Sequence, residues 1–107
     1  MRPRQLKMSF EALDDLLGMY DHIAAFDALA ARRFLDDING KIEWIAKLGI
    51  AGSPREFIPG LRAFPYRNRC IYFFIDDETL SVLRVLHGRQ KIELSHFLRF
   101  YQTEQED

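Results

Sequence analysis

The hydrophobic and polar positions along this 107-residue chain change period several times, and each change predicts a new element. Residues 4–9 alternate loosely, with Leu6 and Met8 on one face between basic neighbours. Because the side chains of a strand point alternately to its two faces, this pattern predicts a short β-strand.

A helical period begins after Ser9. This serine suits a helix N-cap, and Glu11 falls in the first turn, where the helix dipole favours a negative charge. Apolar side chains then recur at three- and four-residue steps, which predicts an amphipathic helix with one apolar face. The positions of this face are Phe10, Leu13, Leu17 and Tyr20, with Leu16, Ile23 and Ala24 beside them.

A second helical pattern follows Asp27, which is itself a candidate N-cap, so the two helices are expected to form a hairpin. Its apolar positions are Ala31, Phe34 or Leu35, Ile38, Ile42, Ile45 and Leu48. Asn39 and Gly40 form a turn-type dipeptide, but the apolar stripe continues through them. The pattern therefore predicts one helix that ends at Gly49.

Glycines and prolines mark residues 49–60 as a loop. Three short apolar segments follow, at residues 61–66, 70–75 and 80–87, and they predict strands. The polar residues 76–79 have the length of a hairpin connection between the last two strands.

Both of these last strands are apolar on both faces. Cys70, Tyr72 and Phe74 alternate with Ile71, Phe73 and Ile75, while Leu80, Val82 and Leu86 oppose Leu83 and Val85. Strands of this kind are covered on both sides, and one helical hairpin covers only one. The other cover is expected to be a C-terminal helix at residues 93–102, a second copy or a partner. The acidic residues 103–107 are expected to fray.

The composition indicates a single domain over residues 1–107, with 48% hydrophobic residues and a net charge of −1. The charge is unevenly spread, because residues 54–91 carry seven bases and four acids. Such a stretch either forms a local positive patch or simply solvates a sheet surface. With no secretory leader, no apolar run of bilayer length and one cysteine, we expect a cytoplasmic protein.

Motifs for cofactor or metal chemistry are missing. The chain has no glycine-rich phosphate loop, and His22, His87 and His96 fall on separate elements without metal-ligand spacing. Neither a cofactor nor a metal is therefore expected. Cys70 lies in an apolar strand, where burial disfavours the thiolate and hence a role as nucleophile.

Arginines on or beside the strands are the remaining candidates for function. They are Arg62, Arg69, Arg84 and Arg89. Arg84 interrupts an otherwise apolar strand, so its charge requires either an ion pair with a helix carboxylate or an anionic ligand.

Three segments of the chain resemble the ParE branch of the RelE/ParE toxin superfamily. They are Gly60-Leu61-Arg62, Ile71-Tyr72-Phe73 and Val82-Leu83-Arg84-Val85-Leu86-His87-Gly88-Arg89, of which the last is the most specific. The resemblance covers residues 4–98. It implies an α+β fold in the order β-α-α-β-β-β(-α), with a helical hairpin packed on one face of a small antiparallel sheet.

The resemblance also implies the toxin of a type II toxin–antitoxin system. ParE toxins inhibit DNA gyrase without being enzymes, so no catalytic residue is expected. The implied partners are gyrase and a tightly bound ParD-like antitoxin in a hetero-oligomer, with no membrane and no direct nucleic-acid binding outside the complex. The expected effector or target-binding residues are Arg62, Arg84, His87 and Arg89. The expected antitoxin-binding apolar surface comprises Tyr72, Phe74, Leu80, Val82, Leu86 and Phe97.

Two alternatives stay open. A RelE-like protein cuts messenger RNA on the ribosome, and here Arg62, Arg69 and Arg89 would contact phosphate. Against it, the loop 49–60 has no lysine, and Cys70 and Ser95 stand near the positions of a strand arginine and a C-terminal tyrosine of the nucleases. The second alternative is a degenerate, non-toxic module that still binds an antitoxin.

Overall fold

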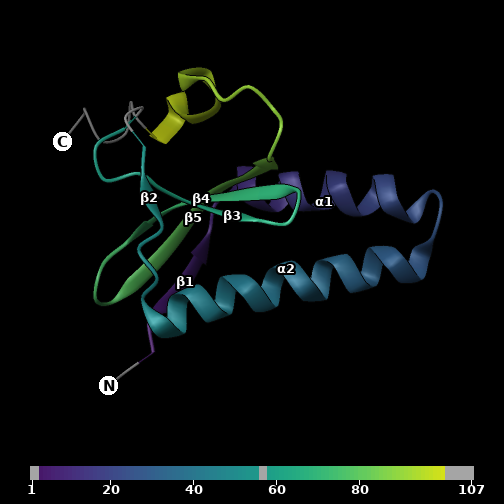
Figure 1. Cartoon of the computed structure of the whole chain (residues 1–107), viewed down its shortest axis with the longest axis horizontal. Helices are drawn as coiled ribbons and strands as arrows, with labels where there is room; N and C mark the ends of the chain where they lie inside the picture. The colour runs from purple at the N-terminus through teal and green to yellow at the C-terminus, as the bar shows by residue number, and fades with distance from the viewer. Residues whose placement is uncertain (1–2, 56–57, 101–107) are drawn as a thin grey trace.

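The computed structural model describes residues 3–55 and 58–100 as a five-stranded sheet with helices on both faces (Figure 1). Its elements are β1 (Gln5–Met8), α1 (Phe10–Ala24), α2 (Ala28–Leu48), β2 (Ser53–Pro54), β3 (Arg62–Tyr66), β4 (Arg69–Ile75), β5 (Thr79–His87) and the 3-10 helix η1 (Leu94–Phe97). Residues 98–100 continue η1 as α-helix. The α+β class and the helical hairpin are confirmed, whereas residues 101–107, with the helix end and acidic tail expected there, lie outside the described residues.

The sheet is mixed rather than wholly antiparallel. Its strand order is β1-β5-β4-β3-β2, and β1 runs parallel to β5 while the other three pairs are antiparallel. The two helices follow β1 directly, so β1 does not form a hairpin with the next strand in the chain. It pairs instead with β5, the last strand. Ser9 fixes this junction, because its N–H donates to Val82 O at 3.0 Å and its Oγ donates to Leu83 O at 2.6 Å.

The helix ends lie where the sequence predicts them. The N–H of Ala12 donates to Ser9 Oγ at 2.9 Å, and the N–H of Ala30 donates to Asp27 Oδ1 at 3.1 Å. Gly49 ends α2 in the left-handed conformation, with φ of 69°. The α2 helix is continuous through Asn39 and Gly40. Capping residues next to each helix therefore set where both helices begin and where α2 ends.

The predicted apolar face of α1 is wrong, because the helix presents a different side to the sheet. Ala12 and Leu16 are the buried residues, whereas Phe10, Leu13 and Leu17 are 76%, 52% and 56% exposed. Since α1 is apolar on two sides, its periodicity did not determine which one is buried. The small side chain at Ala12 gives α1 a close approach to the core, and the larger side chains remain outside.

A bulge in β5 changes the expected alternation of this strand. Phe73 pairs with Val82 but Tyr72 pairs with Arg84, so Leu83 is an extra residue. Leu80, Val82 and Val85 consequently join the core under the hairpin, while Leu83 and Leu86 join the opposite one. The prediction that Leu86 shares a face with Leu80 and Val82 is therefore wrong. The alternation predicted for β4 is confirmed.

Two cores lie on opposite faces of the sheet. The first is covered by α1 and α2, and the second is covered by residues 92–100, here called the C-terminal segment (Figure 1). Phe97 in η1 is completely buried there, and its ring meets the edge of Tyr72 at 5.2 Å between centroids. A second contact ties the segment to α1, where Arg99 Nη2 donates to Glu11 Oε1 at 2.8 Å. The chain thus supplies its own cover for the second face.

The carboxylate of Asp76 accepts hydrogen bonds inside the turn of the predicted β4–β5 hairpin. Asp76 Oδ1 accepts the N–H groups of Glu78 and Thr79 at 2.8 and 2.7 Å, which lowers the pKa of Asp76 below its ordinary value of 3.8. The ionised carboxylate therefore adds stability above pH 3.8, and this stability is lost as pH falls through the lowered pKa. We expect Asp76→Asn to be less stable than the parent near neutral pH, with a difference that shrinks below pH 3.8. Urea unfolding across pH tests this, and a constant difference would contradict it.

Candidate functional site

Arg84 forms a clamp between α1, β5 and the C-terminal segment. Its Nε and Nη2 donate to the two carboxylate oxygens of Asp15 at 2.8 and 2.7 Å, and its Nη1 donates to His96 O at 3.1 Å. Asp15 Oδ2 also accepts the N–H of Val85 at 3.0 Å. The two side chains are only 20% and 12% exposed, and Asp15 raises the pKa of Arg84. Of the two alternatives for Arg84, the structure contains the ion pair with a helix carboxylate.

A groove of about 430 Å³ lies beside this clamp, between α1 and the ends of β4 and β5. Its charged and polar lining residues are Asp14, Asp15, His22, Arg69, Arg84, His87 and Gln90. The groove therefore brings together two of the predicted effector residues, Arg84 and His87. It combines cations with carboxylates, and Asp15 already neutralises Arg84.

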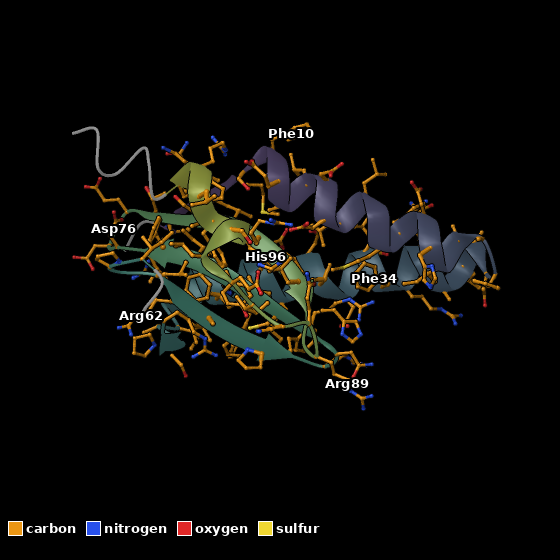
Figure 2. The ribbon with its side chains drawn as sticks, turned by 90° about the horizontal axis from the view of Figure 1, so that it is seen from above. Phe10, Phe34, Arg62, Asp76, Arg89 and His96 are labelled. Carbon is orange, nitrogen blue, oxygen red and sulfur yellow. The ribbon has the colours of Figure 1, made fainter. Side chains whose placement is uncertain are left out.

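His87 and Arg89 lie where β5 ends. His87 pairs with Arg69 across the sheet, and its Nδ1 accepts the N–H of Arg89 at 3.2 Å. Both side chains are exposed. Arg62 lies elsewhere, because it pairs with Phe73 near the other end of β4 (Figure 2). The structure thus groups three of the four predicted effector residues and separates Arg62 from them.

Arg69 is the residue that the predicted effector set omitted. Its Nε lies 3.2 Å from Met19 Sδ, and its guanidinium stacks over the ring of Phe34 at 5.3 Å. The sequence feature that points to Arg69 is its position at the start of a strand, two residues after Arg67. Only the register with His87, however, places it beside the groove.

The predicted antitoxin surface is not an open surface in this structure. Phe74 is partly exposed, but the other five residues of that set are buried: Tyr72, Leu80, Val82, Leu86 and Phe97. Leu80 and Val82 lie under the helical hairpin, Tyr72 and Leu86 lie in the second core, and Phe97 belongs to η1, which covers that core. The chain itself therefore covers five of these six residues, and their role in binding an antitoxin stays a prediction.

Exposed apolar side chains gather on α1 instead. We call Phe10, Leu13 and Leu17 the α1 stripe; Phe10 projects from the outer side of the helix (Figure 2). An apolar groove of about 360 Å³ runs beside the stripe between α1 and α2, and its walls include Tyr20 and Leu35. Contiguous exposed apolar surface of this kind is typical of a protein-binding site.

The buried polar groups of the second core are unsuited to acid–base work at neutral pH. Burial raises the pKa of the Cys70 thiol and raises the pKa of Tyr72 to about 12. Within residues 3–55 and 58–100, no three His, Cys, Asp or Glu side chains are grouped as metal ligands. In the same part of the chain, every helix is too short or too polar to cross a bilayer.

Comparison with known proteins gives a family match and similar solved structures. The sequence model described as the ParE toxin of the type II toxin–antitoxin system parDE matches residues 6–92. The solved structure titled "Chromosomal ParDE TA system from P. aeruginosa" superposes with a TM-score of 0.67 and 24% identity, covering 78% of this chain and 95% of that chain. At this identity the structural match shows the fold alone. No curated protein matches the chain.

Proposed function

The chain belongs to the ParE toxin family of type II toxin–antitoxin systems, and we propose on this basis that it inhibits DNA gyrase and is neutralised by a tightly bound ParD-like antitoxin. The observation that carries this proposal is the family match over residues 6–92, which spans the helical hairpin, the sheet and the predicted effector residues. Membership in a toxin–antitoxin family implies an antitoxin partner, while gyrase as the target is part of the proposal.

The proposed mechanism requires binding rather than catalysis. The toxin attaches to gyrase, holds the enzyme on cleaved DNA and so blocks replication. His87 and Arg89 supply exposed polar and cationic groups at one end of the sheet, while Arg84 is a positioning residue that holds α1 and η1 in place. Arg62 belongs to a separate part of the surface.

The ribonuclease alternative has weaker support from the same residues. Cleavage through the 2′-hydroxyl of RNA requires groups that move protons near neutral pH. Cys70, which stands near the position of a strand arginine of the nucleases, is 6% exposed, and burial raises the pKa of its thiol. The absence of new 5′ ends in messenger RNA after induction would eliminate this alternative.

Arg89→Ala tests the effector surface. Arg89 is exposed and follows the last strand, so its removal should leave folding intact while reducing toxicity. Growth arrest is measured after induction at matched expression, and Arg32→Ala, which removes an exposed arginine from α2, serves as the control. Growth arrest equal to that of the parent protein would count against a role for Arg89.

We propose that the antitoxin covers the α1 stripe with an apolar segment. Leu17→Asp places a charge at the end of the stripe that lines the apolar groove and should weaken the toxin–antitoxin complex about tenfold or more. Leu48→Asp is a matched control, because Leu48 is 55% exposed on α2 and Leu17 is 56% exposed on α1. Calorimetric titration with the ParD-like antitoxin measures both variants. Equal affinities would place the antitoxin elsewhere.

Inhibition of gyrase tests the proposed function directly. The purified, folded protein without antitoxin is titrated into a supercoiling reaction, and supercoiled product should disappear as its concentration rises. Stoichiometric antitoxin should restore supercoiling. Undiminished supercoiling at the highest toxin concentration would contradict the proposal.

A further inference from the structure

We propose that the bound toxin touches DNA as well as gyrase. The cationic rim, which we define as Arg67, Arg69, Arg89 and Lys91 with the exposed His87 beside them, binds the phosphodiester backbone of the duplex that gyrase holds. This inference rests on the proposed inhibition of gyrase and deepens it by assigning a second, nucleic-acid partner to the same end of the sheet.

Two turns that are distant in sequence form the rim. The N–H of Gly88 donates to Asn68 O at 2.7 Å, and Arg69 pairs with His87 at the ends of β4 and β5. Arg67 occupies the β3–β4 turn with φ of 56°, and Arg89 follows β5 at the edge of the molecule (Figure 2). The fold therefore concentrates cations from residues 67–69 and 87–91 on one edge.

The carboxylates around this edge neutralise only part of its charge. Asp37 Oδ2 lies 3.1 Å from Arg67 Nε, and Glu93 Oε1 lies 4.0 Å from Lys91 Nζ. Asp15, in the adjoining groove, already forms an ion pair with Arg84. Asp14 also lines that groove. Among the residues that the structure describes, neither Arg69 nor Arg89 has a carboxylate within ion-pair distance.

Arg69 is held in place by groups that leave its charge intact. Its guanidinium is fixed by Met19 Sδ and by the face of Phe34, and its Nη1 donates to Asn68 O at 3.4 Å. A guanidinium ordered by neutral groups loses less conformational entropy when it binds an anion. Its planar array of donors also matches the oxygens of a phosphate. Arg69 is thus oriented to bind an anion, and no carboxylate among residues 3–55 and 58–100 lies within ion-pair distance of it.

The rim is suited to DNA that is already held by gyrase. Two unpaired arginines contact about two phosphates, and each contact contributes a slope of roughly −0.9 to the salt dependence of binding. So few contacts, on a chain with net charge −1, give weak affinity for free DNA. When gyrase binds both the toxin and the duplex, the rim meets the backbone at high effective concentration.

The test compares the affinity of the labelled toxin for gyrase with and without a duplex that contains a cleavage site. Fluorescence anisotropy gives the ratio of the two dissociation constants, here called the DNA gain. We expect a gain of about tenfold for the parent protein, corresponding to two phosphate contacts. The gain should disappear in Arg69→Gln/Arg89→Gln, and the salt slope measured with DNA should become shallower by about two.

Two further variants make the result specific. Lys7→Gln/Lys47→Gln removes two exposed cations from β1 and the end of α2, away from the rim, and should retain the full gain. Arg69→Lys/Arg89→Lys keeps the charge and should retain part of it. Thermal unfolding establishes that each variant is folded.

The unfavourable outcomes are distinguishable. A parent protein that binds gyrase equally well with and without DNA overturns the DNA contact and leaves gyrase inhibition standing. A full gain in the double glutamine variant overturns the assignment to this rim. Failure of the folded parent protein to bind gyrase in either condition overturns the proposed function and this inference with it.

Discussion

Replacing Arg84 with alanine is expected to lower the free energy of unfolding by about 2–4 kcal/mol. The variant leaves Asp15 with a charge in a site where its side chain is 12% exposed and retains only the N–H of Val85 from the clamp. It also removes the donor to His96 O, which connects β5 to η1. The expected loss is somewhat below that for a fully buried pair, because Arg84 is 20% exposed.

Thermal and urea unfolding measure this loss, and the midpoint temperature should fall by roughly 10–25 °C for a domain of this size. The double variant Asp15→Leu/Arg84→Met is the informative control. It removes both charges together, so it should recover part of the stability. Stability of Arg84→Ala within about 0.5 kcal/mol of the parent would show that the clamp does not hold the fold together.

Phe97→Ala is expected to lower the free energy of unfolding by about 3 kcal/mol and to promote self-association. Phe97 is completely buried and is the aromatic residue of η1 that packs on Tyr72. Without this ring, the C-terminal segment loses its main apolar contact with the second core. When the segment detaches, it uncovers Leu83 and Leu86.

Urea unfolding gives the stability of this variant, and sedimentation over a range of concentrations gives its association state. Leu98→Ala is the matched control, because Leu98 is adjacent but 43% exposed. We expect it to remain close to the parent in both measurements. A Phe97→Ala protein that is monomeric and as stable as Leu98→Ala would refute the covering role of this segment.

The sequence predicted those features that depend on neighbouring residues. Ser9, Asp27 and Gly49 set the helix ends through short-range backbone contacts, and the α2 stripe continued through Asn39 and Gly40 as expected. The β4–β5 hairpin and the order of the other elements follow from the same kind of local pattern, but the two-residue strand β2 (Ser53–Pro54) falls in the predicted loop and was missed, because it is defined by its pairing with β3.

The features that it missed depend on contacts between distant residues. The bulge at Leu83 is defined only by pairing with Tyr72 and Phe73 of β4. The parallel arrangement of β1 and β5 likewise joins the two ends of the domain. Because both sides of α1 are apolar, packing against the sheet decided that the α1 stripe stays exposed.

The sequence predicted which types of residue form the candidate site, but not which of them lie close together. The sequence required an ion pair or an anion for Arg84, and the fold selected Asp15 from several helix acids. His87 and Arg89 adjoin in sequence, whereas Arg69 reaches them only through the strand register. Arg62 was assigned to the same effector set although it lies near the other end of β4.

The proposed function requires that the protein holds gyrase on cleaved DNA. The most direct measurement is a cleavage assay, in which gyrase, plasmid and purified toxin are incubated, denatured and resolved by electrophoresis. Linear plasmid should accumulate with toxin concentration and disappear when stoichiometric antitoxin is added. If folded toxin produces no linear plasmid while gyrase still responds fully to a known cleavage-stabilising inhibitor, the proposed trapping of gyrase on cleaved DNA is contradicted.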